Sequence, residues 1–214
     1  MSRMINDKIM YKLFLIFFLT VSSAATAEES KSEQILEKNA TKIAEIEKYL
    51  NGIKNLSADF VQETSEGKIA KGKFYLSRPG KMRVEYNGEP QVLVVVNDSV
   101  LSYHDLELDE ISNISTNTTP ASFLTRSNIS FAAKDVEITE FREFDDKIKI
   151  SVLKKNRKEA GEFSIIFSAN PIAFVKMEVK NDLDQLIVVT LSNLTFPERL
   201  ASRLFVIKNK NLPQ

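Results

Sequence analysis

Cysteine and tryptophan are absent from this chain of 214 residues, and histidine occurs only once. Without a thiol the chain forms no disulfide, offers no cysteine nucleophile and cannot be acylated as a lipoprotein. Only six glycines are present, and none belongs to a glycine-rich loop of the kind that binds nucleotide phosphates. Lipoproteins, thiol enzymes and P-loop enzymes are therefore excluded, and stability must come from the hydrophobic core.

The candidates for catalysis and metal binding are few. His104 lies beside Asp105, a neighbourhood that is compatible with a catalytic dyad. We expect instead that His104 is a solvent-exposed residue at the end of a strand. Asp105, Glu107, Asp109 and Glu110 form an acidic run that lacks the glycine and the ligand spacing of a calcium loop. We expect a solvated turn or strand face there. The sequence predicts no catalytic residue, no metal site and no cofactor.

The N-terminus has the pattern of a secretory signal peptide. Basic residues precede the apolar run LFLIFFLTV at 13–21, and Ala25-Thr26-Ala27 supplies the small residues that a signal peptidase needs. The run is short for a membrane anchor of about 20 residues, which is the alternative. We predict a cleaved signal peptide at residues 1–27, starting from Met1 or Met10.

The mature chain is then residues 28–214, a length that suits a single domain. Cleavage removes three of the 29 basic and one of the 29 acidic residues, which leaves a net charge of −2. This balance argues against general affinity for nucleic acid or anionic membrane surfaces. We expect a periplasmic monomer that does not bind nucleic acid.

Hydrophobic periodicity predicts a mainly β chain with a few helices, in the α+β class. The first mature segment has one apolar stripe at helical spacing, formed by Ile35, Leu36, Ile43, Ile46, Leu50 and Ile53. Short helices are predicted at Thr119–Leu124, with Thr119 as the cap, and at Pro197–Leu204. We expect the first helix to pack on a sheet.

The rest of the chain alternates with period two, as half-buried antiparallel strands do. The predicted inward sets are Leu56, Ala58 and Phe60; Ile148, Ile150 and Val152; Phe163, Ile165 and Phe167; and Ala173, Val175, Met177 and Val179. QVLVVVN at 91–97 and QLIVVTL at 185–191 are more uniformly apolar, so we expect cover on both faces. A sheet of this size tends to curl, and helices over its apolar face would close it.

Four short motifs, in order, resemble the periplasmic outer-membrane lipoprotein carrier family, LolA. They are LSADFVQE at 56–63, GKFYLSRPGKMRVEY at 72–86, TPASFL at 119–124 and LSNLTFPERLASRLFVI at 191–207. The resemblance covers nearly the whole mature chain. It implies a half-open β-barrel of about eleven antiparallel strands, with a helical lid over an apolar cavity. The family commonly has aromatic residues where this chain has Met82 and Val84.

The resemblance also implies roles for individual residues. Arg78 and Pro79 match the arginine-proline pair whose arginine contacts the lid helices and holds the empty form shut; the alternative is a solvated turn arginine. Cavity-lining candidates are Phe60, Phe74, Leu76, Met82, Val84, Phe123 and Leu124, although Met82 and Val84 suit a plain core equally. Lys81 and Arg83 are candidate contacts for a partner protein, or ordinary wet-face residues.

Family members take triacylated lipoproteins from an inner-membrane ABC transporter, LolCDE, to the outer-membrane receptor LolB. The resemblance therefore implies such partners for this chain, with LolB or a substitute as receptor. The alternative is a lipid-binding or envelope-sensing protein of the same fold that is not dedicated to lipoprotein transport. A secreted hydrolase is disfavoured because no nucleophile and base stand together in the sequence.

Overall fold

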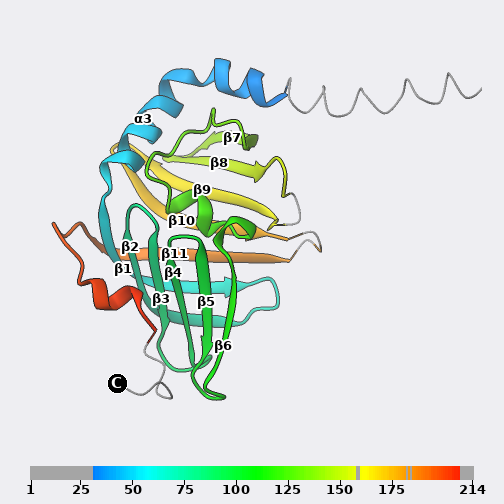
Figure 1. Cartoon of the computed structure of the whole chain (residues 1–214). Coiled ribbons are helices and arrows are strands. Elements are labelled where there is room, and N and C mark those ends of the chain that lie inside the picture. Colours follow the sequence, from blue (N-terminus) through cyan, green and yellow to red (C-terminus); the bar gives the residue numbers. More distant parts are fainter. Residues whose placement is uncertain (1–30, 158–159, 182, 184, 208–214) are drawn as a thin grey trace, which may run out of the picture.

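The computed structural model describes residues 31–157, 160–181, 183 and 185–207. The predicted signal peptide at 1–27 lies outside the described residues. The described chain forms one antiparallel sheet that curves around two helical segments (Figure 1). This confirms the predicted mainly β fold class and the open, unclosed barrel.

The sheet has eleven strands in the described chain, and its two edges are β6 and β7. The spatial order is β6-β5-β4-β3-β2-β1-β11-β10-β9-β8-β7. Nearly every neighbour in space is also a neighbour in sequence; β1 with β11 is the exception. The strands are β1 (Asn55–Thr64), β2 (Ile69–Ser77), β3 (Lys81–Tyr86), β4 (Val92–Asn97), β5 (Val100–Asp105), β6 (Glu110–Ser115), β7 (Val136–Phe144), β8 (Lys147–Lys154), β9 (Glu162–Ala169), β10 (Ile172–Lys180) and β11 (Leu186–Thr195).

Helical segments cover one face of this sheet, which we call the inner face. Residues 31–38 are helical and are followed by α3 (Ala40–Gly52). The predicted apolar stripe is confirmed, because Ile43, Ile46 and Leu50 are buried against the sheet. Ser32 also accepts a hydrogen bond through its hydroxyl from the Ile138 backbone amide at 3.1 Å. The N-terminal helix thus covers part of the β7 edge, which would otherwise leave backbone donors unpaired.

The β2–β3 hairpin forms as the sequence predicts. Leu76 pairs with Met82 and Phe74 with Val84 across it. Gly80 closes the turn with φ of +82°, and a Cβ there would overlap the Asp98 carboxylate. Only glycine combines this left-handed conformation with this close approach.

Two expectations for β10 and β11 are wrong. A register shift between Phe174 and Lys176 in β10 inserts an extra residue, and a bulge of this kind reverses the alternation of faces. Phe174 and Met177 are therefore both buried, where strict alternation places them on opposite faces. In β11, Ile187 is 37% exposed on the inner face, and Val188 on the outer face pairs with Glu63 and Glu178, so this strand is not covered on both faces.

The outer face of β2–β4 is covered by the C-terminal segment. Phe205 is 2% exposed and packs with Leu93 and Val95, which confirms the double-sided cover predicted for residues 91–97. The predicted helix at Pro197–Leu204 is wrong: the segment runs irregularly into a short 3₁₀ turn, η3 (Ser202–Phe205). Arg83 fixes it by donating to the Leu204 carbonyl at 3.0 Å.

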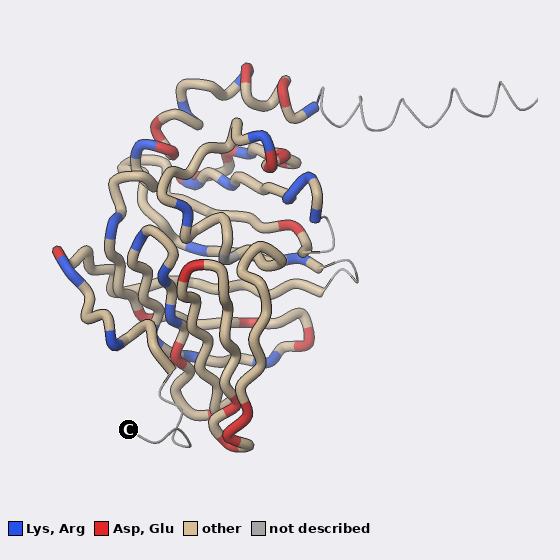
Figure 2. The backbone as a smooth tube through the Cα atoms, viewed as in Figure 1, with Lys and Arg blue, Asp and Glu red and all other residues tan. Residues whose placement is uncertain are grey.

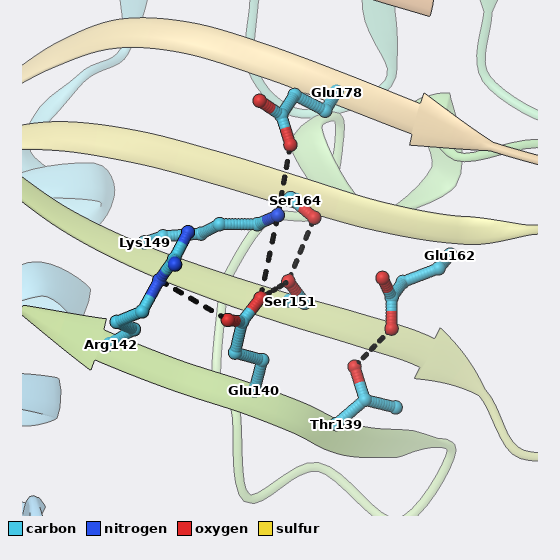
Figure 3. A network of polar contacts seen from close by, with 8 residues as sticks. All are labelled: Thr139, Glu140, Arg142, Lys149, Ser151, Glu162, Ser164 and Glu178. Carbon is cyan, nitrogen blue, oxygen red and sulfur yellow. Dashed lines mark hydrogen bonds and ion pairs between the residues drawn. The ribbon is translucent and has the colours of Figure 1, made fainter. Parts of the chain in front are cut away.

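The outer face of β7–β10 carries polar cross-strand contacts instead (Figure 3). Lys149 pairs with Glu178 at 3.0 Å and with Glu140 at 3.4 Å. The buried hydroxyls of Ser151 and Ser164 lie 2.8 Å apart and satisfy each other. The outer surface of β2–β4 is therefore apolar and covered by the C-terminal segment. The outer surface of β7–β10 is polar.

We predict that Phe205→Ala lowers the free energy of unfolding by about 3 kcal/mol, because it leaves Leu93 and Val95 partly uncovered. Val206→Ala is the matched control, since Val206 is 55% exposed, and it should change stability by less than about 0.5 kcal/mol. Urea denaturation measures both. Equal effects for the two variants would contradict the C-terminal segment as outer cover.

Candidate functional site

An apolar cavity of about 230 Å³ lies on the inner face, between the two halves of the sheet. Its wall is formed by Phe60, Gln62, Phe74, Met82, Val84, Tyr86, Leu101, Thr119, Pro120, Leu124, Phe163, Met177, Val179, Ile187 and Val189. The Tyr86 hydroxyl donates to Gln62 Oε1 at 2.7 Å, so these two polar groups satisfy each other. Burial raises the pKa of Tyr86. The cavity thus offers contacts for an apolar ligand and no charged group.

The structure brings most of the predicted cavity residues together. Phe60, Phe74, Met82, Val84 and Leu124 lie in the wall. Leu76 and Phe123 do not; both are buried in the surrounding core, where Phe123 packs against Phe131 with ring centroids 5.3 Å apart.

Sequence reasoning missed part of the cavity wall. Met177, Val179 and Val189 line the cavity together with Phe60 and Phe74. They come from β10 and β11, more than 100 residues away in sequence. Their period-two spacing in the sequence predicts that they point to one face of a strand. Only the pairing of β1 with β11 shows that these strands line the same cavity.

A short helix, α4 (Ala121–Leu124), covers the cavity from the link between β6 and β7. Phe123 and Leu124 anchor it, at 5% and 3% exposure. Thr119 was expected to cap it, but the Thr119 hydroxyl donates to the Thr116 carbonyl at 2.9 Å instead. The polar side chain is thereby used by the preceding 3₁₀ turn, η1 (Thr116–Thr118).

Arg78 is buried, at 9% exposure, and its guanidinium lies against the end of α3. Nε donates to the Ile53 carbonyl at 2.9 Å, and Nη2 donates to the carbonyls of Ile53, at 2.6 Å, and Leu50. The helix dipole makes these carbonyls favourable partners for a cation. Burial lowers the pKa of Arg78.

The contact is incomplete, since Arg78 Nη1 has no hydrogen-bond partner among the described residues. An unsatisfied buried donor costs about 1–3 kcal/mol. Arg78 therefore binds the helix end while retaining part of its desolvation cost. Pro79 lies exposed in the same turn.

The turn at residues 78–80 touches both helical segments. We expected Arg78 on the lid helices; it bonds α3 only, whereas the Gly80 amide donates to the Thr125 carbonyl just after α4, at 2.8 Å. The two segments are joined again by Asn51 of α3. Its side chain donates to the Ile129 carbonyl and accepts from the Ile129 amide, both at 2.8 Å.

Glu47 adds a second tie between α3 and the segment after α4. Its carboxylate accepts from the Phe131 amide at 2.7 Å and from the Ser130 hydroxyl at 3.2 Å. Together with Asn51, it makes α3 and residues 129–131 one hydrogen-bonded unit. We call this unit, with α4, the lid. Arg78 thus reaches the whole lid through α3.

The other predicted site residues lie elsewhere. Lys81 is half-buried at the start of β3, and Arg83 is held by Leu204 and by Glu85 at 3.0 Å. His104 was expected in water, but it is 6% exposed in β5. Its Nε2 lies 2.9 Å from Asp109, not Asp105, so the expected surroundings of this histidine are corrected.

The acidic run extends from the end of β5 through an exposed turn to the first residue of β6 (Figure 2). The Asp105 carboxylate accepts from the backbone amides of Glu107 and Leu108, both at 3.0 Å. Across the described part of the chain, no three His, Cys, Asp or Glu side chains lie together as metal ligands. Among the same residues, no helix is long and apolar enough to span a bilayer.

An open antiparallel sheet, an apolar inner cavity and a helical cover identify the protein family when combined with the sequence. A family model described as outer membrane lipoprotein carrier protein LolA matches residues 51–208. The chain belongs to the LolA family. The match includes the Arg78 turn, α4 and all eleven strands.

Individual relatives of this LolA family chain are distant. An uncharacterised protein of Rickettsia prowazekii is 25% identical over 174 residues, which cover 81% of this chain and 80% of that protein. An outer-membrane lipoprotein carrier protein of Chromobacterium violaceum is 32% identical over 96 residues, 42% of this chain and 47% of the carrier. The crystal structure of a LolA superfamily protein from Nitrosomonas europaea has 9% sequence identity and a TM-score of 0.47. It covers 77% of this chain and 97% of its own.

We predict that Arg78→Leu loosens the end of α3, because two buried carbonyls lose their donor. A loss of about 2 kcal/mol in local opening free energy corresponds to roughly 30-fold faster hydrogen exchange in residues 46–56. Lys81→Leu, at the start of β3 directly after this turn, is the control and should leave this exchange unchanged. Exchange in that segment as slow as in the wild type would remove Arg78 from the lid contact.

A second prediction concerns the pair that closes the segment after α4. Arg126 donates to both carboxylate oxygens of Asp135, at 3.1 and 2.5 Å. Desolvation, the largest effect, raises the pKa of Asp135, but the hydrogen bond and charge of Arg126 outweigh it, so this pKa lies below its ordinary value of 3.8. The stabilisation is therefore complete above pH 3.8 and is lost as the pH falls through the lowered pKa.

Asp135→Asn should accordingly destabilise the protein by less than about 1 kcal/mol at neutral pH, since the pair is partly exposed. The difference from the wild type should close as the pH falls below 3.8, where protonated Asp135 resembles asparagine. Urea denaturation across this pH range measures the gap. A gap that persists in acid would show that the ion pair is not its cause.

Proposed function

We propose that this chain binds the acyl chains of lipoproteins in its inner cavity and carries them through the periplasm. The cargo would pass from an inner-membrane LolCDE-type ABC transporter to the outer membrane, through a LolB-type receptor or its substitute. The observation that carries this proposal is the lidded apolar cavity within the region that matches the LolA family. The family's members are carriers, and no covalent chemistry is required.

The physics of the cargo explains why a lid is needed. Each buried CH₂ contributes about 0.8 kcal/mol, so one sixteen-carbon chain costs roughly 12 kcal/mol to expose to water. The carrier's own empty cavity would be an exposed apolar patch, which favours aggregation. A lid that closes when no cargo is bound meets both constraints.

The observed cavity suits the closed, empty form of such a carrier. Its volume of about 230 Å³ is below the range of about 300–1,000 Å³ for small-molecule sites. Three acyl chains need more space, so loading requires the lid to move away from the sheet. In the proposed mechanism Arg78 leaves the carbonyls of Leu50 and Ile53 at that step, and returns when the cargo is released.

The same small cavity favours a second candidate function, namely a lipid-binding or envelope-sensing protein that is not dedicated to transport. A sensor needs to admit one chain and not three. Depletion in the native bacterium separates the two functions. Lipoproteins that accumulate at the inner membrane indicate a carrier, whereas an altered stress response with correct lipoprotein localisation indicates a sensor.

The proposal also covers the cellular location and the processing of the protein. Residues 1–27 would be removed on export, and residues 28–214 would act as a single periplasmic domain. We propose a monomer, and its mature net charge of −2 argues against adhesion to anionic lipid as it moves between the two membranes. Lys81 remains a candidate contact for an acidic partner surface.

The test is the release of a triacylated lipoprotein from inner-membrane vesicles that contain the ABC transporter. The purified protein should bring the lipoprotein into the soluble fraction only when ATP is present. Val189→Lys places a charge in the cavity wall and should reduce release at least tenfold. Val188→Lys is the control, because its register partners Glu63 and Glu178 are acids on the other face of the sheet. If the wild type releases no lipoprotein, the carrier function is wrong.

A further inference from the structure

A second hollow lies outside the inner cavity, between the end of α3, the β9–β10 turn and the segment after β11. We call it the α3 groove; its volume is about 870 Å³. Its wall is formed by Glu45, Lys48, Tyr49, Gly52, Ile53, Lys54, Asn55, Ala169, Asn170, Pro171, Ile172, Phe196, Pro197 and Glu198. None of these residues lines the inner cavity. The groove falls within the volume range of small-molecule sites, whereas the inner cavity does not.

Fixed contacts shape the floor of the α3 groove. The Tyr49 ring packs edge-to-face on Phe167, with centroids 6.2 Å apart. The Tyr49 hydroxyl accepts from the Phe174 amide at 3.0 Å, which satisfies its polar end. The far wall is Phe196, which is 54% exposed. A large aromatic side chain at this exposure offers an apolar contact that the protein itself leaves uncovered.

Charge indicates which kind of apolar ligand suits the groove. Lys48 and Lys54 are exposed at its α3 side, and within the described chain neither of them forms an ion pair. Glu45 is already paired with Lys42 at 2.7 Å. Glu198 comes from the C-terminal segment, and its backbone carbonyl accepts from the Asn55 side chain, next to Lys54, at 2.8 Å. Among the described residues the α3 side therefore offers two lysines without an ion pair beside an apolar floor.

We propose that the α3 groove binds a long-chain fatty acid. The hydrocarbon tail lies over Tyr49, Ile172 and Phe196, and the carboxylate lies at Lys48 and Lys54. An uncharged diacylglycerol group would gain nothing from these lysines, which is why a free fatty acid suits the groove better than the acyl end of a lipoprotein. This site is separate from the inner cavity and does not depend on the function proposed for that cavity.

The test uses 5-doxyl-stearate, whose nitroxide broadens the NMR signals of nearby methyl groups. With methyl-labelled protein, the signals of Ile53 and Ile172 report on the α3 groove, and those of Met82 and Met177 report on the inner cavity. We expect the Ile53 and Ile172 signals to broaden. Broadening confined to Met82 and Met177 would overturn the proposal, and because the vesicle assay is separate, it would leave the carrier function intact.

Surface variants test the contacts without disturbing the core. Phe196→Ser should weaken stearate binding about tenfold, whereas Ile69→Ser, at a residue 62% exposed on β2, should not change it. Lys48→Gln with Lys54→Gln should weaken binding about fivefold, and the control pair Lys68→Gln with Lys71→Gln should not. The methyl ester of the probe, which lacks the charge, should bind about fivefold more weakly to the wild type. Equal losses in test and control variants would overturn the site.

Discussion

An unclosed sheet with one apolar face needs a cover, and much of this structure follows from how that cover is attached. The strands hydrogen-bond to one another from β6 to β7 but never meet across the opening, so helices and not a twelfth strand close the inner face. Their attachment combines a few buried apolar side chains with polar contacts from Arg78, Asn51 and Glu47 to backbone groups. Polar contacts can be replaced by water when they separate, whereas large apolar contacts cannot.

Arginine is well suited to the central contact. Its planar fork reaches two carbonyls of the α3 end at once, which the single ammonium of a lysine does not do in a fixed geometry. Its charge also opposes permanent closure, because a buried cation without a counter-ion keeps part of its desolvation cost. The unpartnered Nη1 is the visible part of that cost. These properties suit the role proposed for Arg78, which is to hold the lid shut and still let it open.

The local structure of the chain was predictable because it depends on near neighbours. Alternation placed Leu56, Ala58 and Phe60 inside, and the Arg78-Pro79-Gly80 sequence located the hairpin turn. The predictions were wrong where contacts between residues distant in sequence determine the structure. The bulge in β10 and the irregular C-terminal segment respond to packing that no local pattern records. His104 is buried beside its register partner Leu93, which packs with Phe205 of the C-terminal segment. The α3 groove joins three segments that are far apart in sequence.

The end of α3 couples ligand binding in the α3 groove to the position of the lid over the inner cavity. Gly52 and Ile53 line the groove, and the Ile53 carbonyl is also an acceptor for Arg78. A ligand that packs against α3 in its present position favours the closed lid, and by thermodynamic reciprocity an open lid weakens that ligand by the same factor. Occupancy of the groove and loading of the cavity should therefore oppose each other. If the proposed carrier function and the proposed fatty-acid site both hold, the lid closes more firmly where free fatty acid is abundant, without any contact between the two ligands.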